Sequence, residues 1–131
     1  MKTPSSLLSL VILALLAGCA TTSPQRDLSG MPPINIVTTV SCSDPAIKFT
    51  GTIVSDGHTR NYSGTGSGTF HATGHDIICS FKKTGTAGRI SIAASTSDKG
   101  QGNSTTDRKF GGVRAEFLRA PKEQHDIFTT F

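Results

Sequence analysis

The stretch Ile34-Asn35-Ile36-Val37-Thr38-Thr39-Val40-Ser41 decides the fold of this chain. Aliphatic side chains recur at even spacing, at Ile34, Ile36 and Val40, and polar residues fill most of the other positions. Residues two apart in a β-strand point to the same face, so this alternation indicates a strand with one buried face. Similar short segments, separated by turn residues, continue to Leu118 and predict antiparallel sheet rather than helix.

The composition of the chain also favours sheet. After residue 18 it has nine Ile and four Val against only two Leu, and β-branched side chains prefer pleated sheet. Ser, Thr and Gly are abundant, as in short strands joined by tight turns. We therefore expect an all-β fold, a small antiparallel β-sandwich of about seven strands, with a small β-barrel as the alternative.

The expected strands follow one another at short intervals. After the first, they cover 46–54, 59–64, a short piece around Phe70, 76–83, 89–95, 101–108 and 112–118. The pair Asp56-Gly57 predicts a two-residue hairpin between the second and third strands. The glycine-rich stretch 64–68 is interpreted as a flexible link between strands, because it matches neither a dinucleotide-binding fingerprint nor a nucleophile elbow.

Two cysteines, Cys42 and Cys79, are predicted to form one disulfide. Parity places Cys42 on the face of Val40, and Cys79 on the face of Ile77 and Phe81, so both thiols lie on apolar faces. In an oxidising compartment such a pair normally forms a bridge. The bridge would resemble the inter-sheet pin of immunoglobulin-like sandwiches, although the chain has no Trp to pack beside it.

The first residues of the chain carry a targeting signal. Lys2 precedes an apolar run from Leu7 to Ala17. A membrane-spanning helix needs about 20 apolar residues, so this shorter run is the centre of a signal peptide. The run ends in Leu16-Ala17-Gly18-Cys19, which resembles the lipobox of bacterial lipoproteins. The resemblance covers residues 1–22. It implies cleavage before Cys19, lipidation of its thiol and acylation of its amine, with palmitate as one such acyl group.

The resemblance also implies a location. In lipoproteins of Gram-negative enterics, Asp after the modified cysteine signals retention in the inner membrane, and this chain has Ala20 instead. We expect a protein of the cell outer membrane, lipid-anchored, with its domain facing the periplasm. The expected organisation is a signal peptide at 1–18, lipidated Cys19 and a flexible tether at 19–33, a β-sandwich domain at 34–118 and a C-terminal tail at 119–131.

The tail at 119–131 ends in Ile127-Phe128-Thr129-Thr130-Phe131 after a charged run. We expect such an apolar chain end to pack back on the sandwich, to be disordered, or to add as a strand to another sheet.

His71, His75 and Asp76 are the candidate metal ligands. In an extended strand the two histidines would lie about 13 Å apart, too far to share one ion. A turn at Gly74 would bring them together, but a polar loop leading into the next strand is the simpler interpretation. We therefore expect no cofactor, and a metal-binding carrier lipoprotein using His71 and His75 is one alternative function.

The sequence singles out no catalytic residues. Ser, His and Asp all occur, but no local spacing groups them into a nucleophile, a base and an orienting acid. The formal net charge is +4, yet the basic residues are scattered and Trp is absent, so nucleic acid is not an expected partner. We expect no enzymatic activity, with a small hydrolase as a further alternative.

A few charged residues lie at outward positions of the expected strands. Lys82, Arg114 and Glu116 point away from the apolar faces, and Lys83 and Arg89 bracket a turn. They are interpreted as a solvated outer face, or else as a weak basic patch for anionic lipid, glycan or an acidic partner.

Taken together, these features favour a non-catalytic binding or accessory module for another envelope component. That partner would be an envelope protein or a cell-wall polymer. The sequence identifies no binding residues and no small-molecule ligand.

Overall fold

Nine strands follow one another in the part of the chain that the structure describes. They are β1 (Ile34–Cys42), β2 (Lys48–Ser55), β3 (His58–Thr65), β4 (Ser67–Gly74), β5 (Asp76–Lys83), β6 (Ile90–Thr96), β7 (Gln101–Thr106), β8 (Gly112–Arg119) and β9 (Gln124–Thr130). The structure is a computed structural model and describes residues 27–28, 30–97, 101–119 and 124–131. Those residues include no helix, and hence none long and apolar enough to cross a bilayer.

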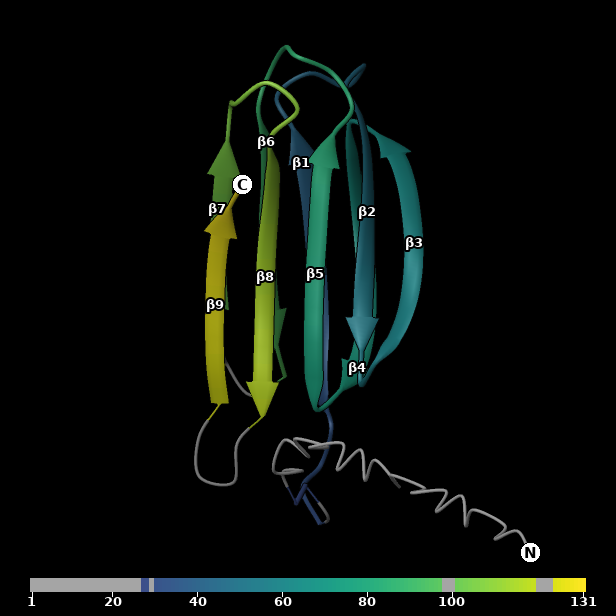
Figure 1. Cartoon of the computed structure of the whole chain (residues 1–131), viewed down its shortest axis with the longest axis vertical. Coiled ribbons are helices and arrows are strands. Elements are labelled where there is room, and N and C mark those ends of the chain that lie inside the picture. The colour runs from purple at the N-terminus through teal and green to yellow at the C-terminus, as the bar shows by residue number, and fades with distance from the viewer. Residues whose placement is uncertain (1–26, 29, 98–100, 120–123) are drawn as a thin grey trace, which may run out of the picture.

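The strands form two antiparallel sheets that face each other (Figure 1). The first sheet has the order β4-β1-β6-β7, and the second has the order β3-β2-β5-β8-β9. The prediction of an all-β fold with two sheets is therefore confirmed, and the strands of the described residues do not join into one closed barrel.

The structure has more strands than the sequence predicted. The piece expected around Phe70 is the full strand β4, and the segment Gln124–Thr130 pairs with β8 as β9. The interpretation of residues 64–68 as a flexible link is wrong, because only Gly66 separates β3 from β4. Gly66 has a φ of 72°, and its N–H donates to the carbonyl of Ile47 at 2.8 Å. This one residue carries the chain from the second sheet to the first.

The predicted hairpin between β2 and β3 is confirmed. Asp56 and Gly57 both adopt left-handed backbone conformations, with φ values of 48° and 82°. The two-residue turn sets the register, in which Ser55 pairs with His58 and Ile53 with Arg60. This register decides which side chains of β3 face inward.

The core lies between the two sheets and is built from the inward positions of strands in both. Its buried side chains are Ile34, Ile36, Val40, Phe49, Ile53, Ile77, Cys79, Phe81, Ile90, Ile92, Ala94, Val113, Ala115 and Phe117. Two phenylalanines each cover a glycine of the neighbouring strand, Phe81 over Gly51 and Phe49 over Gly64. Glycine leaves the room that each ring occupies, which accounts for glycines inside strands.

One charged side chain is completely buried at the end of β5. Lys83 is 0% exposed, and its ammonium donates hydrogen bonds to the carbonyl oxygens of Ala87, Gly88 and Asp107. An ammonium group has three N–H donors, so these three carbonyls satisfy it completely. The bonds join the β5–β6 loop to the β7–β8 loop. The sequence interpretation of Lys83 as part of an outer face is therefore wrong.

Replacing Lys83 by Met is expected to lower the free energy of unfolding by about 2 to 4 kcal/mol, because three carbonyl oxygens lose a charged donor. Lys82→Met changes the neighbouring, exposed lysine and is the matched control, expected to change the free energy of unfolding by less than about 0.5 kcal/mol. Urea denaturation of both variants measures the difference. Equal losses in the two variants would contradict this role for Lys83.

The predicted disulfide between Cys42 and Cys79 is not present, and both cysteines are free. The Cys79 sulfur lies 3.6 Å from the hydroxyl oxygen of Thr38, across the core. Cys42 is four residues beyond Thr38 on β1, which is about 13 Å further along the sandwich. A disulfide needs Cα atoms within about 7 Å. Both thiols face the interior, but their positions along the strand direction are too far apart for a bridge.

The two thiols are expected to differ in reactivity. Burial raises the pKa of Cys79 to about 11, against the opposing effect of its hydrogen bond with Thr38. Burial also raises the pKa of Cys42, and the ammonium of Lys83 partly offsets this. Both thiols therefore carry little thiolate at neutral pH, and only Cys42 is partly exposed.

Alkylation of the native protein should modify Cys42 first and Cys79 only after unfolding, as read by peptide mapping. The variant Cys42→Ser should remove the early modification and leave the later one. If the unfolded, unreduced protein showed no alkylation at either position, the two cysteines would be bridged and the free-thiol arrangement would be wrong.

Candidate binding cleft at the open edge of the sandwich

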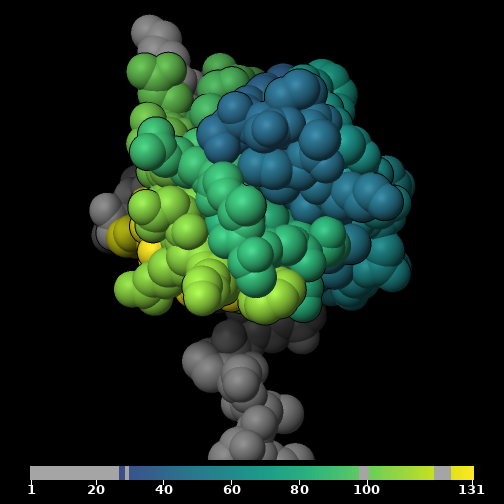
Figure 2. Space-filling model, turned by 90° about the horizontal axis from the view of Figure 1, so that it is seen from above, coloured from purple at the N-terminus to yellow at the C-terminus, as the bar shows by residue number. Residues whose placement is uncertain are grey.

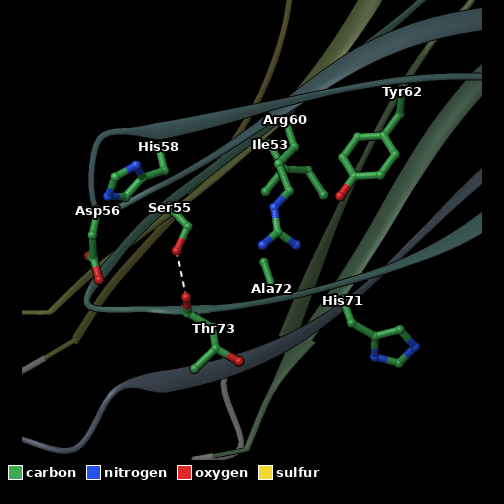
Figure 3. Close-up of a pocket in the computed structure, with 9 residues that line it drawn as sticks. All are labelled: Ile53, Ser55, Asp56, His58, Arg60, Tyr62, His71, Ala72 and Thr73. Carbon is green, nitrogen blue, oxygen red and sulfur yellow. Dashed lines mark hydrogen bonds between the residues drawn. The ribbon is translucent and has the colours of Figure 1, made fainter.

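The edge strands β3 and β4 border a cleft between the two sheets (Figure 3). The cleft has a volume of about 390 Å³. It is lined by Ile53, Ser55, Asp56, His58, Arg60, Tyr62, His71, Ala72 and Thr73. Because β3 and β4 belong to different sheets and do not pair, this edge of the sandwich opens to solvent.

Aromatic side chains close the part of this edge that lies nearer to Gly66. The rings of Tyr62 on β3 and Phe70 on β4 have centroids 4.7 Å apart, and Phe70 stacks on Phe81 of the core at 5.0 Å. Further along β4 the inward residue is Ala72, which fills little of the gap. The cleft is therefore the place where a large inward side chain on β4 gives way to a small one.

Arg60 occupies the open part of the cleft. It pairs in register with Ile53, so it faces inward, and its side chain extends between the strands toward Ala72 (Figure 3). Its guanidinium makes no hydrogen bond or ion pair with any described residue. An inward-pointing charge on an edge strand also discourages edge-to-edge aggregation. The chemistry that the group offers is a planar fork of N–H donors, which matches a carboxylate or a phosphate.

The end of the cleft away from Gly66 is closed by polar contacts between the strands. The Ser55 hydroxyl donates to the carbonyl of Thr73 at 2.5 Å (Figure 3). One carboxylate oxygen of Asp56 accepts hydrogen bonds from the backbone N–H groups of His75 and Asp76, at 2.8 and 2.9 Å. The β2–β3 hairpin is thereby fastened to the β4–β5 turn.

The protonation of Asp56 reflects these contacts. Burial acts to raise its pKa, but the backbone N–H groups of Asp76 and His75 and the nearby His75 ring together lower the pKa below the ordinary value. The carboxylate therefore stays ionised at neutral pH. Its charge is used inside the fold, so Arg60 is the group in the cleft with charge to offer a ligand.

The structure does not gather the predicted metal ligands into one site. His71 lies on β4 at an outward position, and its ring points away from the cleft (Figure 3). His75 lies in the turn after β4, and Asp76 begins β5. No group of three or more His, Cys, Asp or Glu residues that could hold a metal ion occurs among the described residues.

His75 and Asp56 form a pair that resembles part of a hydrolytic triad. The ring atom Nδ1 lies 3.5 Å from a carboxylate oxygen of Asp56, and Nε2 lies 3.0 Å from the carbonyl oxygen of Met31. A carbonyl only accepts, so Nε2 is the donor and cannot take a proton from a serine. The nearby Ser55 donates to Thr73 instead of to a histidine. The pair fastens the chain before β1 to this end of the sandwich.

Sequence reasoning missed Arg60 and Tyr62, although a signal for them was present. The Asp56-Gly57 turn fixes the register of the hairpin, and counting from it places His58, Arg60 and Tyr62 on the inward face. An inward Arg on an expected strand is the anomaly that could have been noticed. Cys19 and the signal segment lie outside the described residues.

No protein family, no curated protein and no solved structure matches this chain. The cleft is therefore described by its chemistry alone. It combines one unpaired guanidinium, a phenol and an imidazole at a concave edge, a set suited to holding an anionic group.

Proposed function

We propose that this protein is a lipoprotein of the bacterial outer membrane, anchored through Cys19, whose domain faces the periplasm. It binds another envelope component and catalyses no reaction. The support for the anchor is the sequence Leu16-Ala17-Gly18-Cys19 after an apolar run. A cysteine carrying several acyl chains stays on a membrane, because stable anchoring needs more than one chain.

The observation that carries the binding proposal is the unpaired guanidinium of Arg60 in the cleft. Arg60 is itself exposed to solvent, and Ile53, Ala72 and Tyr62 line the cleft beside it. A carboxylate or phosphate entering the cleft could accept hydrogen bonds from two N–H donors of this accessible guanidinium without first displacing a partner among the described residues. We propose that the partner is an envelope protein or a cell-wall polymer that presents such a group on a side branch.

The anchor is tested by growing cells with radiolabelled palmitate. The full-length protein should become labelled, and Cys19→Ser should not, because the label requires acylation at that residue. Equal labelling of the two proteins would place the acyl group elsewhere, and the absence of label from both would reject the anchor.

The cleft is tested in intact cells with a photo-crosslinking amino acid at position 58, at the mouth of the cleft. The full-length protein should form an adduct, and adding Arg60→Gln should reduce that adduct about tenfold or more, because a charge-assisted, bidentate contact is lost. The matched control is Arg114→Gln, which removes a cation from the outer face of β8, away from the cleft, and should leave the adduct unchanged.

Two further measurements keep this result interpretable. Arg60→Gln should melt at the same temperature as the unchanged protein, since Arg60 has no bonded partner among the described residues. Arg60→Lys should retain part of the adduct, because lysine keeps the positive charge but lacks the paired N–H donors of the guanidinium. An adduct of equal strength with Gln at position 60, or an equal one from a probe at Thr105 on the outer face of β7, would refute binding in the cleft.

A further inference from the structure

Three loops meet at the end of the sandwich opposite the start of β1. They cover 43–47, 84–89 and 107–111, and they lie side by side in the view onto this end (Figure 2). Backbone hydrogen bonds join them, from Ser43 to Arg89 at 2.9 Å and from Phe110 to Gly85 at 3.1 Å. The end is therefore one continuous surface made by segments far apart in the sequence.

This surface carries an excess of exposed cations. The five basic residues, here called the cationic end, are Lys48, Lys82, Arg89, Arg108 and Lys109. The acidic residues in the same loops are Asp44 and Asp107, and Asp44 already accepts a hydrogen bond from Ala46 N at 2.7 Å. No described carboxylate forms an ion pair with any of the five cations. Five cations against two carboxylates leave this surface with a net positive charge.

A large aromatic side chain projects from the same surface. Phe110 is 60% exposed and has a φ of 51°, in a region that bulky residues rarely adopt. Exposure and backbone strain both cost free energy, and the surrounding structure must hold the residue in place. Packing in the core does not explain its position.

Hydrogen bonds from Lys83 hold two of these loops in place. Its ammonium binds the carbonyl oxygens of Gly88 and Asp107, which directly precede Arg89 and Arg108. The backbone N–H of Lys83 also donates to the carbonyl of Gly111 at 3.2 Å. The backbones that bear the cations and Phe110 are thus ordered before any partner arrives, which lowers the entropy lost on binding.

We infer that the cationic end docks on an anionic phospholipid surface, with Phe110 entering the headgroup region. Aromatic rings favour the interface between water and lipid, and each Lys or Arg near anionic lipid strengthens binding. A single projecting ring among several cations suits a fluid surface that moulds around it. β1 begins at the opposite end of the domain, and only the position of this surface relative to the anchoring membrane rests on the proposed function.

The test places the full chain on neutral phosphatidylcholine donor vesicles. It is held there by its own acyl group or, where it is unacylated, by an N-terminal polyhistidine tag on a nickel-chelating lipid. Acceptor vesicles contain phosphatidylglycerol and phosphatidylethanolamine, or phosphatidylcholine alone, and light scattering reports clustering. We expect clustering with the anionic acceptors only. This clustering should disappear when the salt concentration rises from about 0.1 M to about 1 M, because the Debye length becomes shorter.

Variants separate docking from folding. Arg108→Gln with Lys109→Gln should weaken clustering about fivefold for each cation removed. Phe110→Gly should also weaken it, while the melting temperature stays equal or rises, because glycine adopts this φ without strain. If Phe110 served only to stabilise the fold, Phe110→Gly would lower the melting temperature. The control is Val37→Ala, which changes an exposed apolar residue of β1 and should cluster normally.

Several results would overturn the inference. One is clustering with neutral acceptors as strong as with anionic ones, and another is clustering unchanged by the substitutions at 108, 109 and 110. Binding of soluble polyglutamate without any binding to anionic vesicles would assign the surface to an acidic protein instead. The tag keeps the test valid if acylation at Cys19 fails, so the anchor and the docking surface are judged separately.

Discussion

The ammonium of Lys83 is the contact on which one end of this sandwich depends. Two packed sheets bury their side chains but leave the peptide groups of the connecting loops to find partners elsewhere. Three carbonyl oxygens from two loops converge on one buried cation, which satisfies all of its donors. At the other end a charge of opposite sign has the reverse role, since the carboxylate of Asp56 accepts from two backbone N–H groups. The hydrophobic core joins the faces of the sheets, and these two ions join their ends.

The two surfaces proposed for binding differ in shape and in how they use positive charge. Arg60 is a single exposed guanidinium in a concave edge, and no described residue pairs with it. The cationic end carries five exposed cations and the exposed ring of Phe110 on three adjacent loops and the strand ends next to them. The first arrangement selects the geometry of one anionic group, whereas the second responds to the density of negative charge on a surface. They lie on different elements, so each can be altered without the other.

Much of the fold follows from side-chain alternation, and the errors have physical reasons. The alternation of β1 predicted a strand and the Asp56-Gly57 turn predicted a two-residue hairpin, and the structure confirms both. Parity correctly placed Cys79 on the buried face, but parity carries no information about height along the sandwich, and the disulfide failed for that reason. Parity also places Lys83 on the face of Phe81, but its charge suggested an outer position, because the carbonyl oxygens that satisfy a buried cation cannot be read from the sequence. Arg60 was predictable from register, whereas the cleft around it depends on how two sheets meet at Gly66, which no local pattern specifies.

The cleft has boundaries at both of its ends. At one end Gly66 joins β3 directly to β4, and at the other Ser55 bonds to Thr73 while Asp56 fastens the hairpin to the turn before β5. A polymer cannot lie along such an opening as it would along a groove, because the rings of Tyr62 and Phe70 close one exit and the contacts of Ser55 and Asp56 close the other. What fits is a pendant substituent inserted sideways, with its main chain left outside. The cleft would bind one branch at a time, and its affinity would not depend on the length of the molecule that bears the branch.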